Sequence, residues 1–273
     1  MKLADALEVV SRTDPGLIRS RNEDAIYADA ALGVAILADG MGGYNAGEVA
    51  SGLATSRLAE DLARVINAQA VQGCGLSDAA LVEAHLVNEV RAANLAIFSA
   101  AQSCSQYAGM GTTLVMAWFY DNRMSVAHVG DSRLYRLRGK CFEQLTRDHS
   151  LLQEQLDNGM ISAEQARYAE NRNLVTRALG VDPEVEVEVH DYDVLPGDIV
   201  LLCSDGLNDM LDDEDIALAL RTLGANLPLA ADHLVRMSND QGGRDNVSVI
   251  LIKVLGDYAS PRGWWQQLLA RLK

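Results

Sequence analysis

Five aspartates, far apart in the chain, each lie where an apolar run that predicts a buried strand begins or ends: Asp24, Asp39, Asp131, Asp205 and Asp245. Carboxylates at strand ends can project over the rim of a sheet, and several rims brought together would gather charges that repel one another strongly. Divalent cations relieve such repulsion. Because hard ions prefer carboxylate, carbonyl and water oxygens, an all-aspartate cluster favours Mg²⁺ or Mn²⁺ over zinc.

Length and charge exclude several classes of protein. The chain has 273 residues, 49% of them apolar, which is enough for one large core. A formal net charge of −15, with no basic stripe, argues against nucleic-acid binding. The first residues carry acidic side chains within their apolar stretch and predict no signal peptide, and no apolar run reaches the length of a membrane span. We expect a cytoplasmic protein.

The cysteines show no paired spacing, which favours buried, reduced thiols and argues against disulfides and a structural zinc site; they are Cys74, Cys104, Cys141 and Cys203.

Strand patterns come in blocks separated by helical sequence. We expect a hairpin within residues 25–39 that turns at Leu32-Gly33, and further strands at 112–119, 124–130, 133–138, 185–191, 198–204 and 246–255. The strands between 112 and 138 follow one another closely and predict an antiparallel meander. Helices are expected at 46–70, 78–103, 212–223 and 227–239, the first two separated by a break at residues 73–75. This order predicts an α+β fold of two packed antiparallel sheets with helices on both outer faces.

Two segments differ in character from the rest. Residues 148–180 are polar and weakly helical, which predicts an inserted helical flap. Residues 257–273 carry aromatic and leucine side chains on one helical stripe together with basic residues. We expect this amphipathic tail to follow a catalytic domain of residues 1–256. Docking on its own domain is favoured for the tail, and partner docking or membrane-surface contact are the alternatives.

Asp-Gly is an ordinary turn signal, so Asp39-Gly40 or Asp205-Gly206 alone predicts only a turn. Residues 39–43, however, hold three glycines, which lets the backbone approach an ion closely and leaves the Gly40 carbonyl available as a ligand. Three separate aspartates at apolar strand ends beside a small or amide residue are difficult to attribute to turns.

These motifs, in this order, resemble the metal-dependent Ser/Thr protein phosphatases of type 2C (PPM) in their bacterial form. The resemblance covers roughly residues 11–254 and depends on Arg19…Asn22-Glu23-Asp24, Asp39-Gly40-Met41-Gly42-Gly43, Gly111-Thr112-Thr113, Gly130-Asp131-Ser132-Arg133, Ser204-Asp205-Gly206 and Asp245-Asn246. It implies a four-layer α-β-β-α sandwich of two antiparallel sheets flanked by helix pairs, with a binuclear Mn²⁺ or Mg²⁺ centre in the cleft between the sheets.

The resemblance also implies a set of metal ligands. Asp39 corresponds to the carboxylate that bridges the two ions, and the Gly40 carbonyl binds one of them. Asp205 and Asp245 complete the coordination of the other ion. Asp131 and Asp205 share a third ion that is bound more weakly. A hydroxide held between the bridged ions then attacks phosphorus in line.

Other residues are expected to support this centre. Glu23 and Asp24 correspond to an acidic pair that holds water at the ions, and Asn246 stands beside the ligand Asp245. Arg19 matches the phosphate-binding arginine, because a guanidinium can grip two phosphoryl oxygens; its alternative interpretation is a solvated loop arginine. Met41 stands where animal members carry a histidine proposed as the general acid, so the proton donor to the leaving oxygen is not assigned.

The two histidines nearest the predicted site have different expected roles. His128 lies within an apolar strand and is expected to be a half-buried histidine with satisfied hydrogen bonds. His149, at the start of the flap, is the better candidate for a role in the cleft.

The function implied is hydrolysis of phosphoserine and phosphothreonine in proteins, by a monomer that opposes a bacterial Ser/Thr kinase. One alternative is a catalytically silent binding or regulatory module, which would lack ligand aspartates. The other is a phosphatase for small phosphomonoesters.

Overall fold

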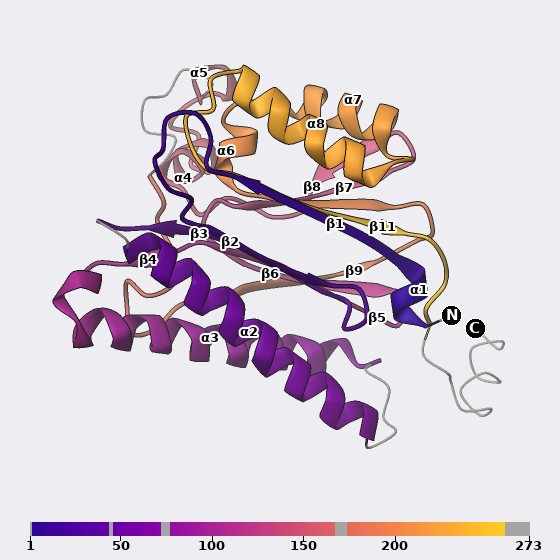
Figure 1. Cartoon of the computed structure of the whole chain (residues 1–273), viewed down its shortest axis with the longest axis horizontal. Helices are drawn as coiled ribbons and strands as arrows, with labels where there is room; N and C mark the ends of the chain where they lie inside the picture. The colour runs from indigo at the N-terminus through magenta and orange to yellow at the C-terminus, as the bar shows by residue number, and fades with distance from the viewer. Residues whose placement is uncertain (1, 44–45, 72–76, 167–173, 260–273) are drawn as a thin grey trace.

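The computed structural model describes residues 2–43, 46–71, 77–166 and 174–259. Two antiparallel sheets stack face to face between two pairs of helices (Figure 1). One sheet is covered by α2 (Ala46–Val71) and α3 (Ala79–Ser103), and the other by α7 (Asp213–Leu223) and α8 (Leu227–Asp240). The predicted α+β fold, a four-layer α-β-β-α sandwich, is confirmed.

Each sheet combines strands from distant parts of the chain. The first has the order β1-β11-β10-β7-β8, formed by Leu7–Asp14, Val247–Val254, Ile199–Cys203, Arg133–Arg138 and Cys141–Gln144. The second has the order β2-β3-β5-β6-β9, formed by Asp24–Asp29, Val34–Met41, Leu114–Tyr120, Arg123–Val129 and Glu188–Asp193, with the short β4 (Gly111–Thr112) pairing with β3. Shorter helices are α1 (Leu3–Ala6), η1 (Ser105–Tyr107) and α6 (Asp205–Asn208).

The core consists of three apolar layers, one between the sheets and one beneath each helix pair. β5 illustrates how a strand serves two layers, since all its residues are buried. Val115, Ala117 and Phe119 pack between the sheets, whereas the alternate residues Leu114 and Met116 pack beneath α2 and α3. Because successive side chains of a strand point to opposite faces, a strand with both faces covered is apolar throughout.

The predicted meander is wrong at its last step. β5 pairs with β6 as expected, but β7 pairs with β10 and β8 in the opposite sheet. The turn at Gly130-Asp131-Ser132 therefore carries the chain from one sheet to the other. Gly130 has a φ of +106°, and a Cβ there would lie 2.8 Å from the Thr113 side chain. Apolar periodicity predicts strands but does not distinguish a hairpin from a crossing between stacked sheets.

Two strands, β1 and β8, escaped prediction. Both lie at the edges of the first sheet and contain few buried residues. An edge strand pairs on one side only, and the apolar pattern that marks a strand weakens when its faces are partly exposed.

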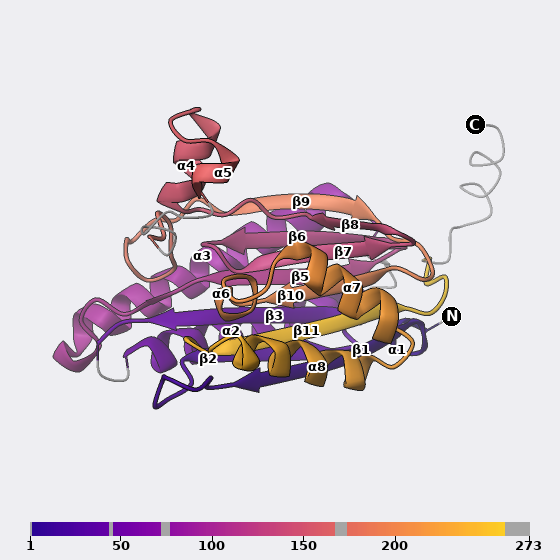
Figure 2. The same ribbon diagram turned by 90° about the horizontal axis from the view of Figure 1, so that it is seen from above.

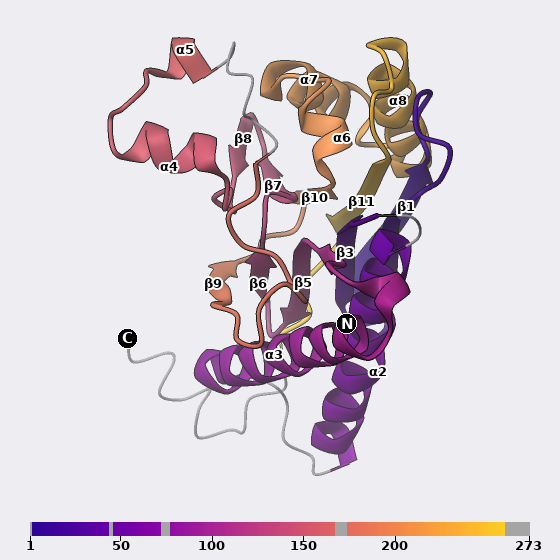
Figure 3. The ribbon, with the colours of Figure 1, turned by 90° about the vertical axis from the view of Figure 1, so that its left-hand side faces the viewer.

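The flap region, residues 148–180, contains α4 (Leu151–Asp157) and α5 (Ala163–Ala166). Figures 2 and 3 show these helices projecting from the molecule on the side of β8 and β9. At their base the outgoing and returning chains pair: the Leu151 N–H donates to the Leu174 carbonyl at 2.9 Å, and Ser150 bridges to Val175. Residues 167–173 of the flap lie outside the described residues.

Cys104, Cys141 and Cys203 are free thiols, as expected. Cys203 is buried within β10, but Cys141 is exposed at the start of the edge strand β8, so the expectation of burial was wrong for Cys141. Cys74 and the predicted break at 73–75 lie outside the described residues, as does the tail from 260 to 273. Within the described ranges, no helix is long and apolar enough to cross a membrane.

Candidate metal and phosphate site

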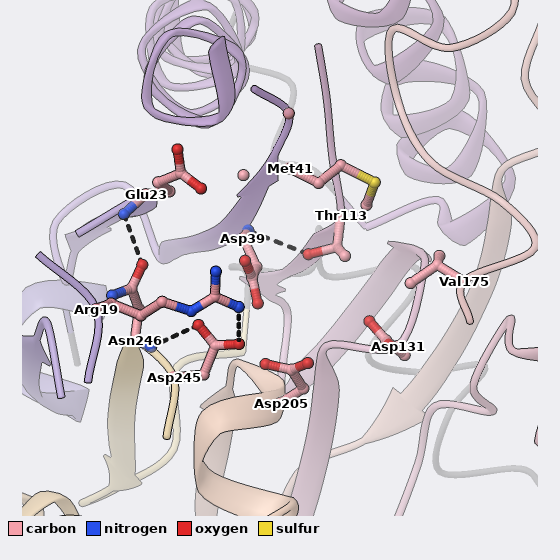
Figure 4. A pocket seen from close by; sticks show the side chains of 12 residues that line it. Arg19, Glu23, Asp39, Met41, Thr113, Asp131, Val175, Asp205, Asp245 and Asn246 are labelled. Atoms are coloured by element: carbon pink, nitrogen blue, oxygen red, sulfur yellow. Dashed lines mark hydrogen bonds and ion pairs between the residues drawn. The ribbon is translucent and has the colours of Figure 1, made fainter. Parts of the chain in front are cut away.

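A cavity of about 250 Å³ lies where the ends of the two sheets meet. Its walls include four of the five predicted aspartates, Asp39, Asp131, Asp205 and Asp245, and also the predicted phosphate-binding Arg19 (Figure 4). The remaining lining residues are Glu23, Gly40, Met41, Gly42, Thr113, Val175 and Asn246. The sequence therefore identified the principal polar groups of one pocket.

Both sheets supply carboxylates to this cavity. Asp39 lies near the end of β3 in the second sheet, and Asp131 lies in the turn that crosses between sheets. Asp205 begins α6 directly after β10, and Asp245 precedes β11, so these two come from the first sheet. The cavity depends on the stacking of the two sheets, because neither sheet contributes the whole set.

Asp24 lies behind the cavity wall. It stands opposite Asp39 in the β2–β3 pairing, and its Oδ2 accepts a hydrogen bond of 2.8 Å from the Ser204 hydroxyl. Its Oδ1 is buried without a partner in the described structure. Burial, to which the charge of Asp245 adds, raises the pKa of Asp24 to about 6.

The carboxylates of the cavity destabilise one another in their ionised forms. Burial, followed by the charges of Asp24 and Asp205, raises the pKa of Asp39 well above its usual range. Burial, followed by the charge of Asp131, also raises the pKa of Asp205 well above its usual range. Asp205 Oδ1 is buried without a hydrogen-bond partner in the described structure. Burial and the charge of Asp148 raise the pKa of Asp131 to about 6.

This donor set fits divalent cations. Buried and half-buried carboxylates converge on one cavity. Asp205 Oδ1 in its wall and Asp24 Oδ1 behind it lack any hydrogen-bond donor among the described residues. Arg19 is the cation that lines the cavity, and one guanidinium does not balance the aspartates around it. Hard oxygen ligands without histidine or cysteine are the environment that Mg²⁺ and Mn²⁺ prefer.

The glycine at position 40 is required by close packing. A Cβ on Gly40 would lie 2.2 Å from the Gly47 carbonyl oxygen and 2.7 Å from that of Glu23. The Gly40 N–H donates to the Glu23 carbonyl at 3.1 Å, which ties β3 to the strand carrying Glu23 and Asp24. Any larger residue would push the Asp39 backbone away from its neighbours.

Asn246 organises the loop that carries Arg19. Its side-chain amide donates to the carbonyls of Pro15 and Arg21, at 2.9 and 2.8 Å, and its Oδ1 accepts from the Glu23 N–H at 2.7 Å. One buried side chain thus fixes both ends of the loop before β2. The supporting role at the metal centre that was predicted for Asn246 stays a prediction.

Arg19 reaches into the cavity from that loop. Its Nη2 donates to Asp245 Oδ2 at 2.7 Å, and its side chain remains 55% exposed. The hydrogen bond and the charge of Asp245 raise the pKa of Arg19, which keeps the guanidinium charged. The Arg19 guanidinium is therefore both charged and accessible to an incoming anion.

Sequence reasoning gave no role to two residues that the structure places here. Thr113 Oγ1 accepts from the Asp39 N–H at 3.1 Å and pairs with the Ser132 hydroxyl at 2.7 Å, so it connects Asp39 to the Asp131 turn. Its place in the Gly111-Thr112-Thr113 motif was the available signal. Val175 reaches the cavity from the returning end of the flap, and nothing in its sequence context marks it.

The two histidines lie apart from the cavity walls. His128 is 1% exposed, which is more buried than expected, because β6 lies between β5 and β9. His149 is 7% exposed and stacks on His128, with ring centroids 4.7 Å apart. His149, the better candidate of the two for a role in the cleft, does not line the cavity and lies among β6, β9 and the base of the flap.

Comparisons with known proteins agree with this geometry. The profile of protein phosphatase 2C matches residues 19–244. The serine/threonine phosphatase Stp of Listeria welshimeri is 39% identical over 248 residues, which cover 89% of this chain and 94% of that protein. The crystal structure of the Mycobacterium tuberculosis serine/threonine phosphatase PstP has a TM-score of 0.82 and 37% identity, covering 92% of this chain and all of that one.

A second structure, of the PstP catalytic domain with two manganese ions, gives a TM-score of 0.78 at 37% identity and covers 92% of this chain and 99% of that one. Sequence profile, relatives and fold all agree with the aspartate-lined cavity between the sheets. The chain belongs to the protein phosphatase 2C family.

Proposed function

We propose that this chain removes phosphate from phosphoserine and phosphothreonine in proteins, in a reaction that depends on Mn²⁺ or Mg²⁺. The observation that carries the proposal is the convergence of the aspartates and Arg19 on one cavity. Relatives that are 34–39% identical over most of the chain are named serine/threonine or protein phosphatases.

The aspartates would hold the ions. Asp39, with the Gly40 carbonyl, would bind the principal pair together with Asp205 and Asp245, and Asp131 would hold a third, weaker ion. When bound, such ions acidify a water molecule and neutralise phosphoryl oxygens. A catalytically silent module is disfavoured because each of these carboxylates is present in the chain.

The other residues position these groups and the substrate. Arg19 would grip the phosphoryl group, while Asn246 holds the Arg19 loop and the Glu23 backbone. Asp24 would hold water at the ions from behind Asp39, assisted by the Ser204 hydroxyl. Met41 lines the cavity and cannot donate a proton, so the leaving oxygen would take its proton from water or from the substrate.

The deciding experiment compares three substrates with the purified protein: a phosphothreonine peptide, a phosphotyrosine peptide and free nucleotides. We expect hydrolysis of the phosphothreonine peptide, its loss in excess chelator and its return with Mn²⁺. Preference for nucleotides would replace protein substrates with small phosphomonoesters. Full activity in chelator would contradict metal dependence.

The biological setting is part of the proposal. A protein phosphatase acts on residues that a kinase has modified, so we propose that this chain opposes a bacterial Ser/Thr kinase in the cytoplasm. It would work as a monomer, because a single chain supplies the cavity walls described above.

Arg19→Ala should mainly raise KM, by about 10- to 100-fold, because it removes a charge-assisted contact worth roughly 1.5–3 kcal/mol while leaving the ligand aspartates in place. Steady-state kinetics on the phosphothreonine peptide provide the measurement. Arg19→Lys should recover part of the loss, since ammonium offers a point charge without the fork. Arg21→Ala is the control for general loss of positive charge, and unchanged kinetics in Arg19→Ala would make Arg19 a solvated loop residue.

Asp131→Ala should leave a folded protein that still binds two ions tightly but turns over slowly. The residue lies in the crossing turn, away from the Asp24–Asp39 pair, so its loss should affect the peripheral ion alone. We expect kcat to fall roughly 10- to 100-fold with little change in KM. Calorimetric Mn²⁺ titration and steady-state kinetics test this expectation. Weakened binding of the tight pair would show that Asp131 is a principal ligand, and a wild-type kcat would show that it is only a turn residue.

A further inference from the structure

A second group of titratable side chains lies outside the cavity. It consists of His128 on β6, His149 between β8 and α4, and Glu188 at the start of β9. Both histidines are buried, and the Glu188 side chain is 30% exposed. Their ligand atoms lie within 4.8 Å of one another, which raises the question of a metal site.

The hydrogen bonds exclude that interpretation. The Gly130 N–H donates to His149 Nδ1 at 3.1 Å, so a neutral His149 carries its proton on Nε2, the nitrogen 3.1 Å from Glu188 Oε2. His128 Nε2 lies 2.9 Å from the Arg147 carbonyl oxygen, which also requires a proton on Nε2. A metal ligand needs a free lone pair, and both nitrogens nearest Glu188 are donors.

His149 instead joins three segments. Its ring Nδ1 accepts from the Gly130 N–H, and its backbone N–H donates to the Gly130 carbonyl at 2.9 Å. Its carbonyl accepts from the Thr176 N–H at 2.8 Å, on the returning strand of the flap. Asp131, which follows Gly130, and Val175, which precedes Thr176, both line the cavity. Side chain and backbone of one residue therefore hold two walls of the site.

Glu188 fixes the orientation of that ring. Its Oε2 accepts from His149 Nε2, and its Oε1 pairs with His190 Nε2 at 2.7 Å. Burial opposes ionisation of Glu188, but the hydrogen bonds from His190 and His149 outweigh it and lower its pKa to about 2. In the neutral ring, an acceptor on Nε2–H keeps the proton on Nε2 and leaves Nδ1 able to accept from Gly130. Burial lowers the pKa of His149 and so favours that neutral ring, although the hydrogen bond to Glu188 acts in the opposite direction.

We propose that His149, oriented by Glu188, is a positioning residue that sets the Gly130-Asp131 turn and thereby determines the affinity of the peripheral ion and the turnover rate. This inference rests on the proposed function, because it takes Asp131 as a ligand. His149 touches neither substrate nor ions, and it acts through the Gly130 backbone.

The test combines Mn²⁺ titration calorimetry with steady-state kinetics on four variants: His149→Ala, His149→Asn, Glu188→Gln and His190→Ala. His149→Ala should weaken the peripheral ion about 10- to 100-fold, the range typical when a partner that orients a ligand is lost. The tight pair should stay within about twofold, kcat should fall and KM should change little. His149→Asn should recover most of the loss, because its Oδ1 can accept from the Gly130 N–H.

The remaining variants separate orientation from packing. Glu188→Gln should show a smaller loss than His149→Ala, since a neutral amide holds the Nε2–H less strongly. His190→Ala should match the wild type, because His190 is 50% exposed and contacts Glu188 without reaching the turn. Thermal unfolding in chelator monitors folding, and His149→Asn and Glu188→Gln keep the test decisive if His149→Ala does not fold.

Several results would overturn the inference: unchanged peripheral affinity in the folded His149 variants, equal weakening of every ion, no recovery in His149→Asn, or a wild-type protein that binds only two ions. Failure of the proposed function looks different, because the wild type itself would then show no metal-dependent hydrolysis of the phosphothreonine peptide.

Discussion

Asp39→Ala is expected to abolish metal-dependent hydrolysis of a phosphothreonine peptide, lowering kcat/KM by about 10³-fold or more. Metal ions supply several kcal/mol of transition-state stabilisation, and each 1.4 kcal/mol is a factor of ten in rate. Burial and the charges of four other aspartates raise the pKa of Asp39. The protein should remain folded, because the substitution removes a buried charge.

The measurement is initial-rate kinetics across a range of Mn²⁺ concentrations, with calorimetry to count tightly bound ions. Asp245→Ala should give a loss of similar size and should also release Arg19 from its ion pair. Glu60→Ala, which removes an exposed carboxylate from α2, serves as the control. Substantial activity in both aspartate variants would contradict the proposed ligand set.

Asp205→Asn should stabilise the metal-free protein while destroying activity. The Asp205 carboxylate is buried with one oxygen unpartnered, and an uncompensated buried charge costs on the order of 1–3 kcal/mol. Asparagine keeps the shape and removes the charge. In chelator at neutral pH we expect the melting temperature to rise by roughly 2 to 12 °C, at about 2–4 °C per kcal/mol for a domain of this size.

The pH dependence of this difference has a definite sign. Because the pKa of Asp205 is raised in the folded state, the native protein binds a proton more readily than the unfolded chain. Ionisation therefore destabilises the wild type increasingly as the pH rises above about 4, the usual aspartate pKa. The advantage of Asp205→Asn should shrink as the pH falls toward 4. Differential scanning calorimetry across this range measures it, with Glu83→Gln on the exposed face of α3 as the control.

The aspartates that line the cavity could be singled out in the sequence because their neighbours constrain them. Asp39 is followed by Gly40, where a Cβ would lie 2.2 Å from the Gly47 carbonyl oxygen. Asp205 and Asp245 flank apolar strands whose burial is evident. The layered fold was predictable because strand and helix periodicities differ and occur in blocks.

The unpredicted features depend on contacts between distant segments. That β7 leaves the sheet of β6 is decided by its pairing with β10, more than 60 residues later, and no local pattern records it. Val175 became part of the cavity only because the flap returns beside Ser150. The burial of His149 similarly follows from its pairing with Gly130 and Glu188, which are far from it in sequence.

The hydrogen bonds of Asn246 also bear on when the protein becomes active during its synthesis. The two fixed ends of the Arg19 loop, Pro15 and Arg21, take their hydrogen bonds from the Asn246 side chain, which follows them in the sequence by 231 and 225 residues. β1 likewise has no strand partner other than β11 within the described structure. A nascent chain that lacks Asn246 cannot form these hydrogen bonds, so we expect the loop that carries Arg19 to take up its place, and activity to begin, only after that residue has been added.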